Sequence, residues 1–346
     1  MIPKIGLEEH CMLPEFVDYW LAAVRGMSDE LIGLMLAQLN ELGERRIELM
    51  DAAGIETAVL SVAGSVLLET DTASAIRIAA KGNDDLALAV GAHPGRLAGF
   101  ATLPLQDPAA AAHELERCVR QLDFKGAMVF GHVHGRYLDE DRFAPIWECA
   151  QDLDVPIYLH PIGSYVMPHH YEGRPQLLGP VWNWTEETAT HALRIIFGGV
   201  FDRYPSARLI LGHMGETLPF MPWRLDSRYE FVNVGRGGAP SIEHLPSYYI
   251  RRNIAVTTAG VCSASALRCA LDELGEDNVI FSTDYPFESL AEAAEFADTT
   301  PIAEHVRRKL CYDNASRILR LHRPRRSAPA ETTYDGRQEM RLAVGA

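Results

Sequence analysis

The sequence has little positive charge and no long apolar run. Lysine and arginine together number 32 against 47 aspartates and glutamates, which gives a formal net charge of −15 and a pI of about 5.3. Nucleic acids and anionic membranes attract basic surfaces, so we expect neither as a partner. No apolar segment approaches the roughly 20 residues that cross a bilayer. A small anionic substrate stays compatible with this composition, because only the local field of its pocket matters.

Cysteines are few and scattered. The six cysteines include no C-x-x-C pair, and such spacing is typical of reduced thiols in the cytosol rather than of a disulfide framework. Met1-Ile2-Pro3-Lys4 leads directly into the first expected strand, without the pattern of a signal peptide. We therefore expect a cytoplasmic protein.

The sequence does contain a series of short apolar runs that alternate with helical patterns. The expected strands are Lys4–Glu9, Glu56–Val62, Leu97–Leu103, Ala127–Gly131, Pro156–His160, Arg208–Gly212, Asn253–Thr258 and Val279–Thr283. Most are apolar on both faces, as in a buried parallel sheet. Eight strands that alternate with helices predict a (β/α)8 barrel, also called a TIM barrel. A doubly wound open sheet is the alternative, but no Gly-x-Gly-x-x-Gly follows the first strand.

Helices and long connections complete the predicted domain. The expected helices are Leu42–Ala53, Pro108–Leu122 with Asp107 as N-cap, Glu186–Tyr204 and Ser263–Leu274. The long connections are Cys11–Met35, Val133–Asp141, Ile162–Thr185 and Gly235–Arg252, and we expect most of them to cover the mouth of the barrel. We interpret residues 1–322 as one barrel domain and residues 323–346 as a mobile tail or an arm on a neighbouring subunit.

Histidines and carboxylates stand at the ends of four expected strands. Glu8 and His10 are two residues apart, so their side chains share one face of a strand. His160, His213 and Asp284 each end a later run. The carboxyl ends of barrel strands converge at the mouth, where such barrels keep their active sites. A site of this composition suits one divalent cation, either Zn²⁺ or Mn²⁺.

For other polar residues near these positions, we expect roles other than metal binding. Glu216 is placed to hydrogen bond to one ring nitrogen of His213. His132 begins a loop, where we expect a substrate contact or solvent exposure. The pair His169-His170 is interpreted as surface or lid, and His191 as a packed or hydrogen-bonding histidine of a helix.

These motifs resemble the metal-dependent decarboxylase branch of the amidohydrolase superfamily, whose members act on γ-resorcylate, dihydroxybenzoate, salicylate and 5-carboxyvanillate. The resemblance runs from Leu7 to about Leu321. The matching segments are Leu7-Glu-Glu-His10, Leu103-Pro-Leu-Gln-Asp-Pro108, Tyr158-Leu-His-Pro161, Tyr171-Glu-Gly-Arg174, Leu178-Gly-Pro180, Leu211-Gly-His-Met-Gly-Glu216, Trp223-Arg224 and Phe281-Ser-Thr-Asp-Tyr-Pro-Phe287.

The resemblance implies roles for individual residues. The metal ligands would be Glu8, His10, His160 and Asp284. Asp284 would also move a proton in catalysis, together with His213 and Glu216. Substrate contacts would come from Arg224, His132 and Phe287, with Arg224 meeting either the substrate or a neighbouring subunit. The resemblance also implies a homodimer or a homotetramer.

The implied function is decarboxylation of an ortho-hydroxylated aromatic acid to a phenol and CO2, a reaction that can be reversible. Hydrolysis of a lactone or amide is the alternative, with Asp284 as general base. Hydrolases of the superfamily usually carry His-x-His where this chain has Glu8-Glu9-His10, which favours decarboxylation. A non-catalytic barrel is a third interpretation. The segment Ser61-Val-Ala-Gly-Ser65 and the loop Gly131–Asp141 depart from the resorcylate pattern, so the sequence leaves the ring substituents open.

Overall fold

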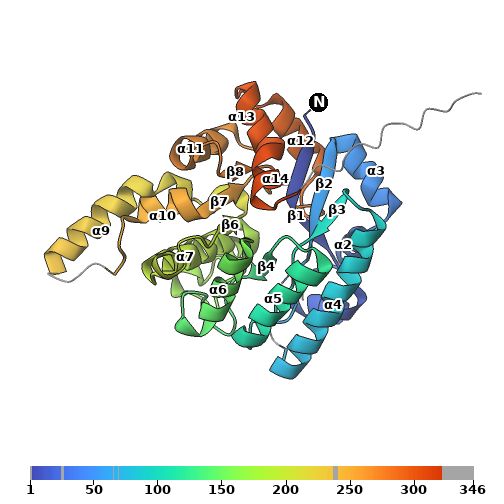
Figure 1. The fold of residues 1–346 in the computed structure, drawn as a ribbon, viewed down its shortest axis with the longest axis horizontal. Coiled ribbons are helices and arrows are strands. Elements are labelled where there is room, and N and C mark those ends of the chain that lie inside the picture. The colour runs from blue at the N-terminus through green and yellow to red at the C-terminus, as the bar shows by residue number, and fades with distance from the viewer. Residues whose placement is uncertain (1, 25–26, 65, 69, 237–240, 322–346) are drawn as a thin grey trace, which may run out of the picture.

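The computed structural model describes residues 2–24, 27–64, 66–68, 70–236 and 241–321. The predicted tail at 323–346 lies outside these residues. The described strands are β1 (Lys4–Cys11), β2 (Ile55–Val62), β3 (Leu97–Gly99), β4 (Ala127–Phe130), β5 (Ile157–His160), β6 (Leu209–Leu211), β7 (Ile254–Thr257) and β8 (Val279–Ile280). Neighbouring strands pair in parallel and in chain order. The prediction of a (β/α)8 barrel is confirmed (Figure 1).

The barrel wall consists of two ladders. One joins β1, β2 and β3, and the other joins β4 through β8. Between β3 and β4, the described residues form a single bridge between Ala101 and Ala127. Between β8 and β1, they form a single bridge between Glu9 and Tyr285. The wall is therefore closed at two seams where main-chain pairing is sparse.

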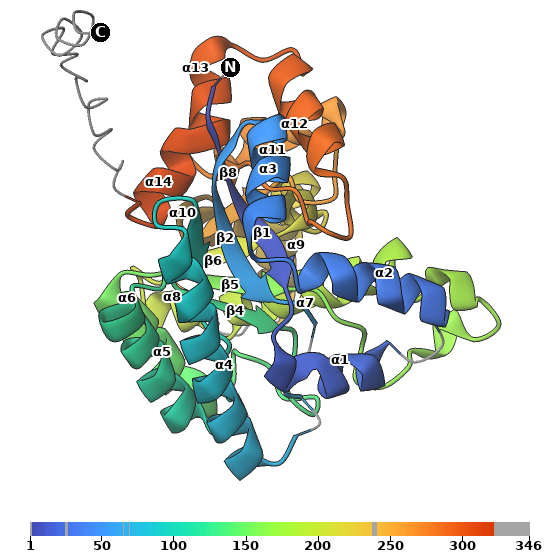
Figure 2. The same cartoon turned by 90° about the vertical axis from the view of Figure 1, so that its right-hand side faces the viewer.

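Helices surround the strands (Figures 1 and 2). They are α1 (Val17–Ala23), α2 (Asp29–Leu39), α3 (Glu44–Ala53), α4 (Thr72–Ala92), α5 (Pro108–Leu122), α6 (Ala144–Leu153), α7 (Asn183–Phe197), α8 (Val200–Arg203), α9 (Pro222–Arg236), α10 (Pro246–Asn253), α11 (Ala264–Leu274), α12 (Leu290–Thr299), α13 (Glu304–Arg308) and α14 (Asn314–Ile318). Among the described residues, none of these helices has the length and apolar character needed to cross a membrane. All six cysteines are free thiols.

Local sequence signals set the start of α5 and the end of α3, as expected. Asp107 caps α5, because its side chain accepts hydrogen bonds from the backbone N–H groups of Ala109 and Ala110. The α3 helix ends at Gly54, which adopts the left-handed conformation that glycine tolerates best.

Three expectations were wrong in detail. The expected helix Glu186–Tyr204 is two helices, α7 and α8, because the chain turns at Gly198-Gly199 and Gly199 has a φ of 69°. The segment Cys11–Met35 is not a loop, since it contains α1 and the beginning of α2. The leucines Leu31 and Leu34 are exposed on the outward face of α2, so the apolar pattern of this helix is hidden in the sequence. The segment Gly235–Arg252 ends in α10 rather than in a loop.

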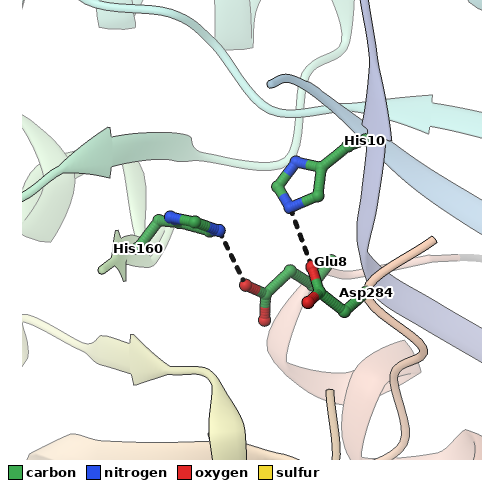
Figure 3. Close-up of side chains that lie close together, drawn as sticks. All are labelled: Glu8, His10, His160 and Asp284. Atoms are coloured by element: carbon green, nitrogen blue, oxygen red, sulfur yellow. Dashed lines mark ion pairs between the residues drawn. The ribbon is translucent and has the colours of Figure 1, made fainter. Parts of the chain in front are cut away.

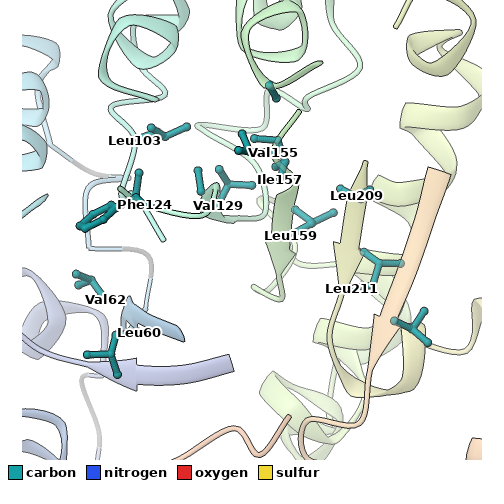
Figure 4. Packing of buried hydrophobic residues seen from close by; sticks show 14 of the residues in the cluster. Leu60, Val62, Leu103, Phe124, Val129, Val155, Ile157, Leu159, Leu209 and Leu211 are labelled. Atoms are coloured by element: carbon teal, nitrogen blue, oxygen red, sulfur yellow. The ribbon is translucent and has the colours of Figure 1, made fainter. Parts of the chain in front are cut away.

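Alternate residues of β5 belong to two different cores. Ile157 and Leu159 belong to the large cluster that packs strands against helices (Figure 4). Tyr158 belongs to the smaller cluster, together with residues of other strands that face the barrel interior. Since side chains alternate along a strand, His160 follows Tyr158 on the interior side. The strand pattern thus delivers a histidine to the inside of the barrel at its carboxyl end.

Replacing Asp107 by alanine is expected to lower the free energy of unfolding by about 1 kcal/mol, because two backbone donors of α5 lose their acceptor. Urea denaturation of both proteins measures the change. Asp107→Asn keeps an acceptor oxygen at the same place and should retain the stability of the parent protein. An equal loss in the asparagine variant would contradict the capping role.

Candidate metal centre

A β-bulge in β1 places Glu8 and His10 inside the barrel. The pairing with β2 is regular at Gly6↔Ala58 but shifts by one residue before Glu9↔Leu60. Upstream of the bulge, Ile5 and Leu7 are the residues that belong to the interior core. Strict alternation would then send Glu9 inward, and the extra residue changes the phase so that Glu8 and His10 face the site instead.

Four side chains converge at the mouth. Ligand atoms of Glu8, His10, His160 and Asp284 all lie within 4.8 Å of one another, and all four residues are buried. His10 Nε2 lies 3.2 Å from Asp284 Oδ1, and His160 Nε2 lies 3.2 Å from Glu8 Oε1 (Figure 3). The ligands come from β1, β5 and the segment after β8, so three separate strand ends contribute to one point.

Three of these atoms are buried and make no hydrogen bond. They are Glu8 Oε1, His10 Nε2 and Asp284 Oδ1. Buried polar atoms are nearly always hydrogen bonded, and an isolated buried carboxylate is costly. A cation among them would satisfy all three. Two imidazole nitrogens and two carboxylate oxygens form a donor set that fits one Zn²⁺ or Mn²⁺ ion.

Neighbouring groups orient the ligands toward this point. His160 Nδ1 donates to the carbonyl oxygen of Pro161 at 2.9 Å, which leaves Nε2 as a lone-pair donor facing the site. His10 Nδ1 lies 3.2 Å from the hydroxyl of Ser61. The Tyr158 hydroxyl donates to Glu8 Oε2. The Glu8 carboxylate also requires glycine at position 212, since a Cβ there would lie 2.5 Å from Glu8 Oε2.

Burial and neighbouring charges shift the protonation of the cluster. Burial raises the pKa of Glu8 to about 7. Burial holds the pKa of His160 well below its usual value, so this imidazole is neutral and able to bind a cation. Burial would raise the pKa of Asp284, but the imidazoles of His10 and His213 outweigh it and lower that pKa.

His213 lies beside the four ligands and is held by Glu216. Its Nδ1 lies 2.7 Å from Glu216 Oε1, and its Nε2 lies 3.6 Å from Asp284 Oδ2. Burial would lower the pKa of His213, but the carboxylates of Glu8 and Glu216 outweigh it and raise that pKa well above its usual value. His213 and Glu216 both have positive φ angles, 48° and 52°. Strained backbone of this kind clusters at functional sites.

Aromatic rings surround the four ligands. The Phe130 ring centre lies 4.4 Å from that of His160, and the Trp184 ring centre lies 6.5 Å from it. Phe287, which is 43% exposed, lies 5.4 Å from the His10 ring. Such walls suit a planar aromatic ligand, because aromatic pairs favour stacked or edge-to-face contacts.

Other candidate residues lie outside the cluster of four. Both ring nitrogens of His132 lie near backbone groups, 3.2 Å from Gly163 O and 3.4 Å from Gly135 N. This arrangement supports a role in holding mouth loops, and the substrate contact of His132 stays a prediction. Arg224 is exposed on α9 and makes no hydrogen bond or ion pair with any residue that the structure describes.

Three further histidines lie where the sequence suggested. His169 and His170 are exposed in a short 3-10 segment, His169–Tyr171. His191 is buried, and its Nε2 accepts a hydrogen bond from Leu138 N at 2.9 Å.

Sequence reasoning missed three residues of the site. Tyr158, Phe130 and Trp184 contact or surround the ligands, yet each appeared as part of an apolar run or a loop. The signal for Tyr158 was present, since it stands two residues before His160 on the same strand. Trp184 comes from the first turn of α7, after a long connection, and no local pattern places it.

Comparisons with known proteins agree with this geometry. A family model described as amidohydrolase matches residues 38–321. The gamma-resorcylate decarboxylase of Rhodococcus jostii (strain RHA1) is 42% identical over 332 residues, which cover 92% of this chain and 99% of that protein.

Two crystal structures are similar over nearly their whole length. A dihydroxybenzoic acid decarboxylase from Polaromonas sp. JS666, with bound manganese and the inhibitor 2-nitroresorcinol, has a TM-score of 0.87 and 38% identity, covering 94% of this chain and 98% of that one. The 5-carboxyvanillate decarboxylase from Sphingomonas paucimobilis has a TM-score of 0.86 and 34% identity, covering 93% and 100%. The chain therefore belongs to the amidohydrolase family, in the branch that these decarboxylases represent.

Proposed function

We propose that this protein is a metal-dependent decarboxylase of an ortho-hydroxylated benzoic acid, with 2,6-dihydroxybenzoate as the first candidate. The observation that carries the proposal is the buried set of two carboxylates and two imidazoles, surrounded by aromatic rings. The relatives support the choice of acid, since the gamma-resorcylate enzymes reach 42% identity and the carboxyvanillate enzyme 34%. Glu8, His10, His160 and Asp284 would hold the metal, which is Mn²⁺ in the similar Polaromonas structure.

The bound cation supplies Lewis acidity, which draws electron density from the acid and its ortho hydroxyl. Asp284 takes up the proton that the ortho hydroxyl loses on binding and delivers it to the ring carbon that bears the carboxylate. The bond to the carboxylate then breaks, its electron pair restores the aromatic ring, and CO2 leaves. The phenolate product recovers a proton from solvent.

His213 contributes charge to this sequence. Burial lowers its pKa, but the carboxylates of Glu8 and Glu216 outweigh this effect and raise the pKa, which favours the protonated imidazole. A fixed positive charge 3.6 Å from Asp284 Oδ2 stabilises negative charge that develops on the substrate. Phe287 and Phe130 flank the ring of the substrate, and His132 provides a further contact to it. Arg224 meets either the substrate or a neighbouring subunit.

We propose that residues 1–322 form one domain, which the continuous strand order supports. A cytoplasmic location is supported by the six free cysteines.

The function is tested with a panel of acids: salicylate, 2,3- and 2,6-dihydroxybenzoate and 5-carboxyvanillate. Mn²⁺-loaded protein is expected to convert 2,6-dihydroxybenzoate to resorcinol, measured by chromatography. Chelation should abolish the product and added Mn²⁺ should restore it, because the ligand set needs its cation. No turnover of any acid, with bound metal verified by elemental analysis, would contradict the proposal and direct attention to lactones and amides.

Asp284→Asn is expected to lower kcat at least about a thousandfold, because an amide cannot carry the proton to the ring. The same preparation is assayed for bound Mn²⁺, so that loss of metal is separated from loss of proton transfer. Glu288→Gln is the matched control, since Glu288 is an exposed carboxylate four residues further along the same mouth segment. A metal-loaded Asp284→Asn protein with the rate of the parent enzyme would exclude this role.

We propose that the protein forms a homodimer or homotetramer through the surface around α9, which projects from the barrel (Figure 1). Phe220, Trp223 and Phe231 are 82%, 76% and 66% exposed. Trp223 and Phe231 lie on α9 and Phe220 lies just before it. Neighbouring exposed apolar side chains of this kind mark an interaction surface. Arg224, unpartnered among the described residues, adjoins them.

Trp223→Glu is expected to shift the sedimentation coefficient toward that of the monomer, because it places a charge in the proposed interface. Leu88→Glu is the matched control, since Leu88 lies on α4 and is 75% exposed, nearly the same as Trp223. An unchanged assembly in the Trp223 variant, or equal dissociation in both variants, would place the interface elsewhere.

A further inference from the structure

At the seam between β8 and β1, main-chain hydrogen bonds join Asp284 N to Glu8 O at 3.0 Å and His10 N to Tyr285 O at 2.8 Å, and side chains make the other contacts described below. β8 ends at Ile280 as a ladder strand, yet the chain continues beside β1 through Ser282, Thr283 and Asp284. The metal ligands stand on both sides of this seam, with Glu8 and His10 on β1 and Asp284 opposite them. Whatever fixes the two segments relative to each other also fixes the distance between these ligands.

Ser282 holds the bulge of β1. Its hydroxyl oxygen accepts hydrogen bonds from the backbone N–H groups of Leu7, at 3.1 Å, and Glu8, at 2.6 Å. These are the two consecutive donors at the point where the β1–β2 register shifts. The extra residue of a bulge disrupts the ladder locally, and here a buried serine on the β8 side of β1 accepts from both amides. Ser282 itself is fixed to the residue after β7, since its backbone N–H donates to Thr258 Oγ1 at 3.0 Å.

Glu9 holds the segment that carries Asp284. Its carboxylate accepts hydrogen bonds from Thr283 Oγ1 at 2.7 Å and from Thr283 N at 3.3 Å. Thr283 Oγ1 in turn accepts from Tyr285 N at 3.1 Å. Asp284 therefore lies between Thr283, which is bonded to Glu9, and Tyr285, which is bonded to Thr283. It has a left-handed φ of 73° that a non-glycine residue adopts only when its surroundings impose it.

The Glu9 carboxylate fits against β1 because position 6 is a glycine. A Cβ at Gly6 would lie 2.1 Å from Glu9 Oε1, so the Glu9 side chain lies back over Gly6 and requires glycine there. Arg46 adds a contact on each side of the seam, since it donates to His10 O at 2.8 Å and its guanidinium lies 4.9 Å from the centre of the Tyr285 ring. Glu9, Ser282 and Thr283 are all at most 1% exposed.

We propose that Glu9, Ser282 and Thr283 form a β8–β1 clamp of positioning residues, which sets the separation of Asp284 from Glu8 and His10 and thereby the affinity for the metal and the rate of proton delivery. The clamp touches neither the substrate nor the metal. Its effect on turnover rests on the proposed function, whereas its effect on metal affinity does not.

Thr283→Val tests the clamp with a change of one hydroxyl to one methyl. The affinity of metal-free protein for Mn²⁺, measured by electron paramagnetic resonance of free and bound ion, is expected to fall about tenfold, the size of effect usual for residues that support metal ligands. The spectrum of the bound Mn²⁺ should broaden, because its ligands become less uniform. With the proposed substrate, kcat should fall more than KM rises. Thr283→Ser, which keeps the hydroxyl, should restore the parent values.

Thr57→Val is the matched control for buried hydroxyl loss. Thr57 lies near the opposite end of the barrel wall on β2, where its hydroxyl donates to Gly95 O at 2.9 Å. It should lower the melting temperature without changing Mn²⁺ affinity or the spectrum. Gly6→Ala provides a second test, because it displaces Glu9 while removing no hydrogen-bonding group, and it should reproduce the weaker Mn²⁺ binding.

Two results would overturn the proposal. One is an Mn²⁺ affinity and spectrum of folded Thr283→Val and Gly6→Ala proteins equal to those of the parent. The other is an equal loss of affinity in Thr57→Val, which would mean that general destabilisation weakens the site. Since Mn²⁺ binding is measured without substrate, a failed decarboxylase assay leaves the test of the clamp intact.

Discussion

The site depends on one electrostatic constraint: two carboxylates and two imidazoles share a buried point within 4.8 Å. Without a counter-charge, such a cluster is costly, since an unpaired buried charge loses its hydration and gains little in return. The raised pKa of Glu8, due chiefly to burial, expresses the same cost. A divalent cation removes this cost of burial. The hydrogen bonds of Tyr158 to Glu8 and of His160 to Pro161 hold two of the ligands in place for it.

The barrel explains why these residues meet. Parallel strands end at one mouth, so side chains separated by more than a hundred residues arrive together without any local motif. The interior core of Ile5, Leu7 and Tyr158 lies directly before the ligands in the sequence. Packed apolar residues therefore fix the strand ends from which the ligands project.

Much of this arrangement could be predicted from the sequence. The eight strands and the convergence of Glu8, His10, His160 and Asp284 follow from apolar runs that end in polar residues. The hydrogen bond between His213 and Glu216 follows from their spacing in one turn. These features depend on local patterns or on the topology of the barrel as a whole, and both are visible in a sequence.

The remainder depends on register between distant segments. The bulge in β1 and its acceptor Ser282 lie some 270 positions apart in the chain, and neither residue has a distinctive neighbourhood. Trp184 reaches the site from the first turn of α7, which follows a long connection whose path no local signal determines. The break between α7 and α8 was visible as Gly198-Gly199, but the apolar periodicity on both sides favoured a single helix.

Because the wall is divided into two ladders, the cation also links two parts of the barrel. Glu8 and His10 belong to the ladder of β1–β3, whereas His160 belongs to that of β4–β8 and Asp284 follows its last strand. An ion held by all four is a cross-link between two arcs that otherwise share few backbone bonds at either seam. Like a covalent cross-link, the bound ion joins the two arcs. Metal binding therefore stabilises the closed barrel and completes the reactive centre at the same time.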